Sequence, residues 1–272
     1  MKHLLTIAGS DSSGGAGIQA DLKTFEELGV YGMTALTCIV AMDPDNEWAH
    51  NVFPIDMHIV EQQLKTIVEG IGVDAMKTGM LGSAQLVELV AHTIDKYQLK
   101  NIVIDPVMVC KGCDMILVPD AAAVIKEQLV KRCDIITPNV IEAAYLADMS
   151  AVKTLDDIKE ACGRIKEMGA KNVVIKGGER MESDEAVDVF YDGKDFVEMS
   201  TAKIYPSYNH GAGCTYSAAV TAGLANGLTV AEAVAQAKRF ITAALEHSFA
   251  LNKFVGCTNH TAYKTVSYTH LR

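Results

Sequence analysis

Short apolar runs of strand length alternate along the chain with longer segments in which apolar residues recur at helical spacing. The predicted strands are Lys2–Ala8, Gly32–Met42, Asp74–Thr78, Asn101–Val109, Asp134–Thr137 and Asn172–Lys176. The predicted helices are Ile18–Leu28, Ile55–Val68, Ala84–Tyr97, Pro119–Val130, Asp156–Met168, Cys214–Asn226 and Val230–His247, with a shorter one after Asn139. A strand, a loop and a helix repeat about every 30 residues, which is typical of a parallel sheet with helices on both faces.

The later part of the chain departs from this rhythm. Two alternating runs, Ala186–Tyr191 and Phe196–Ser200, are joined at Asp192-Gly193, which is a strong signal for a β-hairpin. The segment Asp43–Phe53 holds the only tryptophan and is interpreted as a polar connector. The predicted fold class is therefore α/β, with a mostly parallel central sheet, helices on both faces and an antiparallel edge hairpin.

Composition and charge narrow the class of protein. A chain of 272 residues with 49% apolar content can bury one large core, so one domain is favoured over two. The formal net charge of -10, without a cluster of Lys and Arg, argues against a nucleic-acid partner. No uninterrupted apolar stretch reaches the roughly 18 residues of a membrane span, and the amino terminus lacks the features of a signal peptide. We therefore expect a cytoplasmic protein without a membrane partner.

The cysteines number seven, an odd count that favours reduced thiols over a disulfide framework. Cys110 and Cys113 form a C-x-x-C pair, a spacing found in redox centres and in zinc sites. No second such pair exists and the eight histidines are scattered singly, so the sequence disfavours both functions. The polar residues around the pair indicate a loop that could close over a site and carry Cys110. An inert surface thiol is the alternative.

Two glycine-rich loops each precede a predicted helix. The stretch His210-Gly211-Ala212-Gly213-Cys214-Thr215 leads into an alanine-rich helix, where backbone N–H groups and the helix dipole favour an anion such as phosphate. The other loop, Gly9–Gly17, follows the first strand and places Ser10 and Asp11 at the strand end where open α/β sheets bind ligands. Glycines also serve ordinary turns, and the polar residues of Gly9–Gly17 could simply cap the helix.

Seven motifs, in order along the chain, resemble those of the ribokinase superfamily. They are Gly9-Ser10-Asp11, Gly14–Lys23, Lys77–Leu81, Asp105–Met108, Thr137-Pro138-Asn139 with Glu142, Lys176-Gly177-Gly178 and Gly211–Cys214. They look like the branch that contains hydroxymethylpyrimidine (phosphate) kinases and bacterial pyridoxal kinases. The resemblance runs from Lys2 to about Tyr263 and implies a ribokinase-like three-layer sandwich. It makes residues 1–263 one kinase domain and 264–272 a tail that could be non-native.

The resemblance also implies a phosphoryl transfer from ATP to a hydroxymethyl group. Cys214 stands where most sugar kinases of the superfamily carry an aspartate as general base, and a helix amino terminus lowers the pKa of cysteine thiols, which suits this role. The substrate ring is expected to contact Ser10, Asp11, Met80, Val107 and Cys110. ATP is expected to contact Asn139, Glu142, Lys176, Gly178, Gly211, Ala212 and Gly213. Mg²⁺, held directly or through water, is expected at Asp105 and Glu142.

Two kinds of substrate remain open within this branch. Cys110 in a lid loop together with Cys214 resembles the two-cysteine pyridoxal kinases, which points to phosphorylation of pyridoxal, pyridoxine and pyridoxamine in vitamin B6 salvage. The aldehyde of pyridoxal could form a reversible hemithioacetal with Cys110, which would make both cysteines catalytic. The alternative is a hydroxymethylpyrimidine or hydroxymethylpyrimidine phosphate kinase of thiamine biosynthesis. A catalytically silent sensor with the kinase fold is a third, disfavoured class, and the superfamily habit suggests a homodimer.

Overall fold

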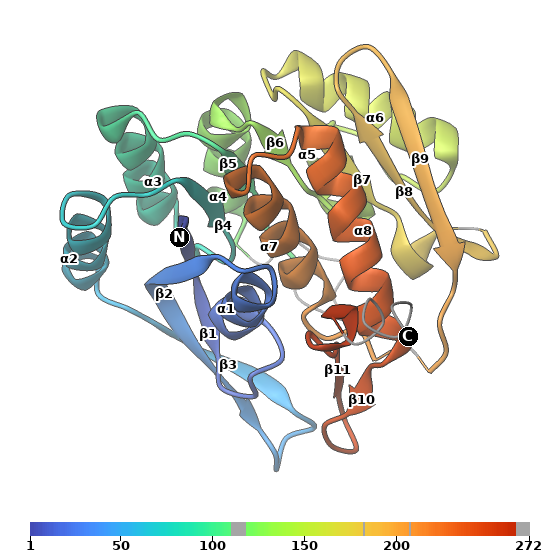
Figure 1. The fold of residues 1–272 in the computed structure, drawn as a ribbon, viewed down its shortest axis with the longest axis horizontal. Coiled ribbons are helices and arrows are strands. Elements are labelled where there is room, and N and C mark those ends of the chain that lie inside the picture. Colours follow the sequence, from blue (N-terminus) through green and yellow to red (C-terminus); the bar gives the residue numbers. More distant parts are fainter. Residues whose placement is uncertain (110–117, 182, 207, 265–272) are drawn as a thin grey trace. The chain divides into compact units, whose positions relative to one another are not determined.

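The computed structural model describes residues 1–109, 118–181, 183–206 and 208–264. They belong to two compact units, each of which contains strands flanked by helices (Figure 1). The first unit comprises Met1–Met80 and the chain from Ile204 onward, and the second unit comprises Leu81–Lys203. The boundaries predicted from the sequence, one domain over 1–263 and a tail over 264–272, remain predictions, and residues 265–272 lie outside the described ranges.

The first unit is built around strands in the order β3-β2-β1-β4. β1 (His3–Asp11) lies parallel to β2 (Tyr31–Asp43) and β4 (Ala75–Thr78), whereas β3 (Ala49–Pro54) pairs antiparallel with β2. Its helices include α1 (Gly17–Glu27), α2 (Met57–Val68), α7 (Ala212–Ala225) and α8 (Val230–Glu246). A short antiparallel pair, β10 (Phe249–Ala250) and β11 (Gly256–Cys257), follows α8.

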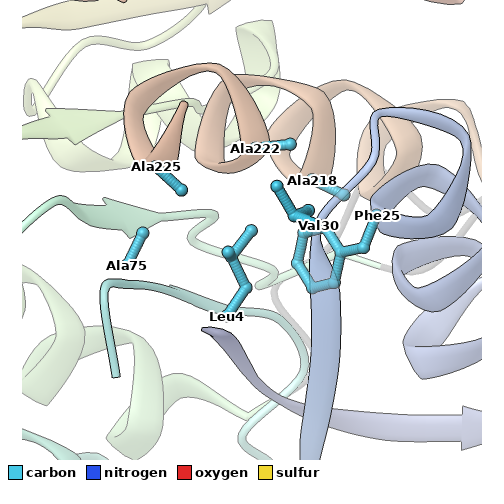
Figure 2. Packing of buried hydrophobic residues seen from close by; sticks show 7 residues of the cluster. All are labelled: Leu4, Phe25, Val30, Ala75, Ala218, Ala222 and Ala225. Atoms are coloured by element: carbon cyan, nitrogen blue, oxygen red, sulfur yellow. The ribbon is translucent and has the colours of Figure 1, made fainter. Parts of the chain in front are cut away.

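Helix α7 packs closely because its side chains are small. It contributes three alanines to a buried cluster that consists of Leu4, Phe25, Val30, Ala75, Ala218, Ala222 and Ala225. Figure 2 shows these alanines facing Leu4 and Phe25. Toward α8, a Cβ atom at Gly223 would lie 2.8 Å from Cβ of Ala233. The small residues therefore hold α7 tightly in the unit, which gives its amino-terminal turn a firm base.

The second unit continues the same design and ends in a hairpin. Its strand order is β5-β6-β7-β8-β9, for strands β5 (Ile102–Ile104), β6 (Ile135–Ile136), β7 (Val173–Lys176), β8 (Glu185–Tyr191) and β9 (Phe196–Ala202). The first three of these strands are parallel, and β8 and β9 are antiparallel. The α-helices are α3 (Ala84–Tyr97), α4 (Pro119–Val124), α5 (Val140–Leu146) and α6 (Leu155–Glu167). The predicted α/β class, its mostly parallel sheet and its edge hairpin are confirmed.

The prediction of a polar connector at Asp43–Phe53 is wrong for its second half, which forms strand β3. Its backbone pairs with β2 over six positions, from Cys38 opposite Pro54 to Asp43 opposite Ala49. Val52 and Phe53 are exposed, so the strand buries no apolar face. Hydrophobic periodicity reports burial, and an exposed edge strand therefore leaves no such signal in the sequence.

Two further elements differ from their predicted form. The strand predicted at Asn101–Val109 pairs with its neighbour only over Ile102–Ile104. It ends there because Pro106 has no N–H to donate. The chain then turns, and the Val107 N–H donates to Asp105 O at 2.9 Å. The helix predicted at Pro119–Val130 continues beyond α4 as a π-helical turn, Ile125–Leu129, and a 3₁₀ turn, Val130–Arg132. Within the described ranges, no helix is long and apolar enough to cross a membrane.

Candidate active-site clusters

The first glycine loop is held by the two residues at the end of β1. Asp11 is buried; its Oδ1 accepts a hydrogen bond from the Ser13 N–H at 2.8 Å and its Oδ2 accepts one from the Ala16 N–H at 2.7 Å. The Asp11 N–H donates to Gln19 Oε1 at 3.0 Å, and Gln19 Nε2 donates to Ser10 Oγ at 2.7 Å. Asp11 therefore shapes this loop up to Ala16, the residue immediately before α1.

Asp11 also contacts a residue from the far end of the chain. Its Oδ2 lies 2.7 Å from Nε2 of His210, and both side chains are buried. Burial raises the pKa of the Asp11 carboxyl, but hydrogen bonds from His210 and Ser13 outweigh this effect and lower the pKa to about 2. The carboxylate is therefore ionised at neutral pH and can only accept, so His210 Nε2 donates in this hydrogen bond.

The two glycine loops lie directly against each other. Gly211 has a φ of +83°, and a Cβ atom there would collide with the carbonyl oxygen of Gly15. A Cβ atom at Gly15 would in turn collide with the His210 ring and with Sγ of Cys257. Packing alone therefore requires glycine at both positions, whether or not a ligand binds there.

Cys214 is a half-buried thiol in the first turn of α7. Gly211 caps this helix, and the Ala212 N–H donates to Asn209 O at 3.0 Å. Gly213 and Cys214 come next, in the turn whose N–H groups have no acceptor within a helix. The geometry suits an anion bound beside a thiol.

We expect Gly211→Ala to destabilise the protein more than Gly227→Ala, a matched control at the other end of α7. Both glycines have positive φ, +83° and +87°, but a Cβ atom at Gly227 meets nothing within 4 Å. The control should lose about 1 kcal/mol from left-handed strain, and Gly211→Ala should lose a further 1–3 kcal/mol or so from overpacking. Urea unfolding of both variants measures the difference. Equal losses would show that the close approach of the two loops is unimportant.

The second unit gathers charged groups where its parallel strands end. Lys176, the last residue of β7, places its Nζ 3.0 Å from Oδ1 of Asp105, which follows β5. Thr137, which follows β6, donates from Oγ1 to the same oxygen at 3.2 Å. Asp105 and Thr137 are buried, and Lys176 is half-buried. The carboxyl ends of parallel strands are where ligands of α/β sheets bind, so this cluster has the expected location.

Glu142 and Asn139 form a capping box at the start of α5. Asn139 Oδ1 accepts from the N–H groups of Ile141 and Glu142, while Glu142 Oε2 accepts from the Asn139 N–H at 2.9 Å. Glu142 Oε1 also accepts from the Met108 N–H at 3.3 Å. Burial raises the pKa of the Glu142 carboxyl to about 7; Lys176 opposes this shift and Asp105 adds to it.

The raised pKa of Glu142 makes stability depend on pH in a defined direction. Between pH 4.5 and about 7, Glu142 is protonated in the folded protein. In the unfolded chain, where the pKa of the carboxyl is 4.5, the same group has already lost its proton. This contribution to stability is fully present below pH 4.5 and is lost as pH rises through about 7. We therefore expect the wild type to lose stability between about pH 5 and 7.5 relative to Glu142→Gln, whose side chain does not titrate. Urea unfolding at both pH values measures this; parallel changes in the two proteins would contradict the shift.

Glycine is needed for different structural reasons at the two positions after β7. The Gly177 N–H donates to Oδ1 of the buried Asp188 at 3.1 Å, and a Cβ atom at Gly177 would collide with the Val187 carbonyl oxygen. Gly178 has a φ of +54°, and a Cβ atom there meets nothing within 4 Å. Packing explains Gly177 and backbone conformation explains Gly178, so the predicted contact of Gly178 with ATP stays a prediction.

The predicted site residues in the described part of the chain fall into two clusters, one in each unit. The first unit holds Ser10, Asp11, Met80, Gly211, Ala212, Gly213 and Cys214. The second unit holds Asp105, Val107, Asn139, Glu142, Lys176 and Gly178. Cys110, predicted to contact the substrate from a lid, lies outside the described residues, as does Cys113. The contacts of all these residues with ligands stay predictions.

No role for His210 was predicted from the sequence, although this residue opens the glycine turn. Its partner Asp11 lies 199 positions away, so no spacing rule connects them. The signal available was the type of residue: a histidine beside a glycine turn and an aspartate at a strand end can form a charged hydrogen bond.

Asp105 and Glu142 are suited to a Mg²⁺ ion that is bound through water molecules and substrate phosphates. In the described part of the chain, no group of three or more His, Cys, Asp or Glu side chains is arranged to hold a metal. Asp105 and Glu142 accept hydrogen bonds from neighbouring protein groups. Mg²⁺ usually keeps several waters and binds one or two carboxylates together with substrate phosphates. These two acids can serve a hydrated ion of that kind.

A hollow on the second unit lies away from this charged cluster. It measures about 640 Å³ and is lined by residues around the amino-terminal ends of β5 and β6, among them Asn101, Arg132 and Asp134. Ligands of open α/β sheets bind at the opposite, carboxyl ends of the strands. We therefore assign the site to the charged cluster and not to this hollow.

Both clusters fit a small-molecule kinase of the ribokinase superfamily. The chain belongs to the phosphomethylpyrimidine kinase family, whose model matches residues 11–259. It is 57% identical over 264 residues to the pyridoxine kinase of Bacillus subtilis (strain 168), covering 97% of each chain. The crystal structure of an ADP complex of Bacillus subtilis pyridoxal kinase matches with a TM-score of 0.94 at 57% identity, covering 97% of this chain and 99% of that one. The pyridoxal kinase from Staphylococcus aureus in complex with AMP-PCP and pyridoxal matches with a TM-score of 0.91 at 42% identity, covering 98% and 96%.

Proposed function

We propose that this chain is a pyridoxal kinase, which transfers the terminal phosphoryl group of ATP to the hydroxymethyl group of pyridoxal. Pyridoxine and pyridoxamine are further substrates, and the reaction serves vitamin B6 salvage. The observation that carries the proposal is the 57% identity, over 97% of both chains, to a pyridoxine kinase. Similar structures hold ADP in one case and AMP-PCP with pyridoxal in another, which supports ATP and pyridoxal as the substrates.

In the first unit, the Cys214 thiol and the turn that precedes it act on the reacting groups. The hydroxymethyl oxygen forms a bond to the γ-phosphorus of ATP while the bond from that phosphorus to the ADP oxygen breaks. The Cys214 thiolate takes the proton that the hydroxyl loses, and the N–H groups of Gly211 and Gly213 stabilise the charge of the transferred group, since the Ala212 N–H already donates to Asn209 O. Ser10, Asp11 and Met80 are the proposed contacts of the substrate ring from this unit.

In the second unit, the charged cluster acts on the nucleotide. Lys176 neutralises phosphate charge, and its ion pair with Asp105 fixes the position of its Nζ. Asn139, Glu142 and Gly178 are proposed ATP contacts, and Val107 is a proposed contact of the substrate ring. When bound, Mg²⁺ lowers the charge of the phosphates; Asp105 and Glu142 are the residues that would hold it through water.

The test is ATP-dependent ADP release, in the presence of Mg²⁺, from four acceptors side by side: pyridoxal, pyridoxine, hydroxymethylpyrimidine and its monophosphate. A clear preference for pyridoxal supports the proposal and the predicted role of Cys110. No release from any acceptor would favour a binding protein that has kept the kinase fold.

A second candidate function is phosphorylation of hydroxymethylpyrimidine or its phosphate in thiamine biosynthesis. The family model that matches residues 11–259 is the phosphomethylpyrimidine kinase model, which favours this alternative. A preference for the pyrimidines in the same assay would establish it and leave Cys110 without a catalytic role. The homodimer and the cytoplasmic location expected from the sequence also stay proposals; light scattering on the purified chain tests the first.

A further inference from the structure

The contact between Asp11 and His210 joins the two glycine loops that the sequence presents separately. We propose that His210 is a positioning residue: by binding Asp11 it fixes the turn Gly211–Gly213 against the first glycine loop and so sets the place of Cys214. The catalytic consequence of this inference rests on the proposed kinase function. His210 itself touches no reacting atom in this scheme.

The backbone of His210 is held on both sides by β11 and the residue after it. The His210 N–H donates to Gly256 O at 3.1 Å, and the Thr258 N–H donates to His210 O at 3.4 Å. The imidazole then reaches Asp11 at 2.7 Å. His210 is thus tied to β1 through its side chain and to the β11 segment through its main chain, immediately before the turn begins.

The Asp11 end of the contact is equally well held. The carboxylate accepts from Ser13 and Ala16 within its own loop, so it cannot follow His210 without disturbing that loop. The buried carboxylate also needs every donor that it has, because an ionised group without partners is costly inside a protein. The hydrogen bond from His210 therefore holds the turn Gly211–Gly213 at a defined position against the loop that contains Asp11.

The close approach of Gly15 and Gly211 makes the turn sensitive to that position. The two backbones touch without room for a Cβ atom, and the His210 ring lies beside Gly15. If the ring is removed, the loops lose both the hydrogen bond and the packing that hold Gly211 in its left-handed conformation. The N–H groups at the start of α7 and the Cys214 side chain then move with the turn.

Three variants of the full chain test this inference by steady-state kinetics: His210→Ala, His210→Gln and Thr6→Val. We expect His210→Ala to lower kcat by about 10²-fold, the size typical of a small misplacement at a reacting centre, while the KM for ATP rises by a much smaller factor. His210→Gln should recover much of kcat, because its amide can donate to Asp11. Thr6→Val is the control for general destabilisation, since it removes a buried hydrogen bond to Asp21 at 2.6 Å in the same unit. It should lower the urea midpoint and keep kcat.

The inference fails if His210→Ala keeps the kcat of the wild type, if Thr6→Val loses as much kcat as His210→Ala, or if His210→Gln is no better than His210→Ala. Amide hydrogen exchange without substrate separates this failure from a failure of the proposed function. We expect faster exchange over residues 209–216 in His210→Ala and unchanged exchange over α8. A wild type that turns over none of the four acceptors overturns the proposed function only, whereas unchanged exchange over 209–216 overturns the positioning role.

Discussion

Cys214→Ala is expected to lower the turnover of pyridoxal by about a hundredfold or more, because removal of a positioned general base costs about 10²–10⁴-fold in rate. The affinity for ATP should stay within a few-fold of the wild type. The thiol lies in the first turn of α7, where a helix amino terminus favours the thiolate. Alanine leaves the N–H groups of the turn in place, so the nucleotide keeps its contacts there. ADP-release kinetics and titration calorimetry with ATP measure the two quantities.

The matched control for this experiment is Cys162→Ala. Cys162 is a buried thiol of α6, and burial raises its pKa to about 12, so it has no thiolate to offer at neutral pH. The control should keep wild-type turnover even where its stability falls. If Cys214→Ala loses ATP affinity in step with turnover, the cysteine is a structural residue of the turn.

Lys77→Met is expected to destabilise the protein by about 3–5 kcal/mol, the usual cost of removing one partner of a buried ion pair. Lys77 Nζ lies 2.7 Å from Oδ1 of Asp21, and both side chains are completely buried. Thr6 Oγ1 donates to the other oxygen of this carboxylate at 2.6 Å. Methionine fills the space of the lysine but leaves the carboxylate of Asp21 without its cation. Urea unfolding gives the loss in free energy directly.

The double variant Asp21→Asn/Lys77→Met should recover a large part of that loss, because it leaves no net charge in the buried pair. Lys2→Met is the control at an exposed pair: Lys2 and Asp74 lie 3.0 Å apart, with side chains 53% and 36% exposed. We expect it to cost no more than about 1 kcal/mol. Additive effects of the two single substitutions would show that the buried pair is not coupled.

Elements with strong local signals were predictable from the sequence. The helix predicted at Ala84–Tyr97 has the same bounds in the structure; Ser83 caps it by accepting from the Leu86 N–H. The hairpin around Asp192-Gly193 is likewise where the turn dipeptide indicates. Strand β3 was missed because its pairing with β2 satisfies backbone groups while its side chains stay mostly exposed.

Helix α1 shows what hydrophobic periodicity leaves out. The spacing of Ile18, Leu22, Phe25 and Leu28 predicts one apolar face. In the structure Phe25 is buried and Leu22 and Leu28 pack against its cluster, as this spacing predicts, but Asp21 is buried as well. A charged residue can occupy the inner face of α1 because Lys77 neutralises it there. A pattern that treats every carboxylate as a surface group cannot foresee such a pair.

Sequence alone specified the kind and order of most elements, the location of the glycine loops and the types of residue at the ends of the strands. Those features depend on neighbours a few residues apart. Only the tertiary structure decided which partner each of three carboxylates meets: Asp11 meets His210, Asp21 meets Lys77 and Asp105 meets Lys176, at separations of 199, 56 and 71 residues. Each buried carboxylate pairs with a group that the fold brings close to it, because an unpaired buried charge would cost several kcal/mol or so of folding free energy.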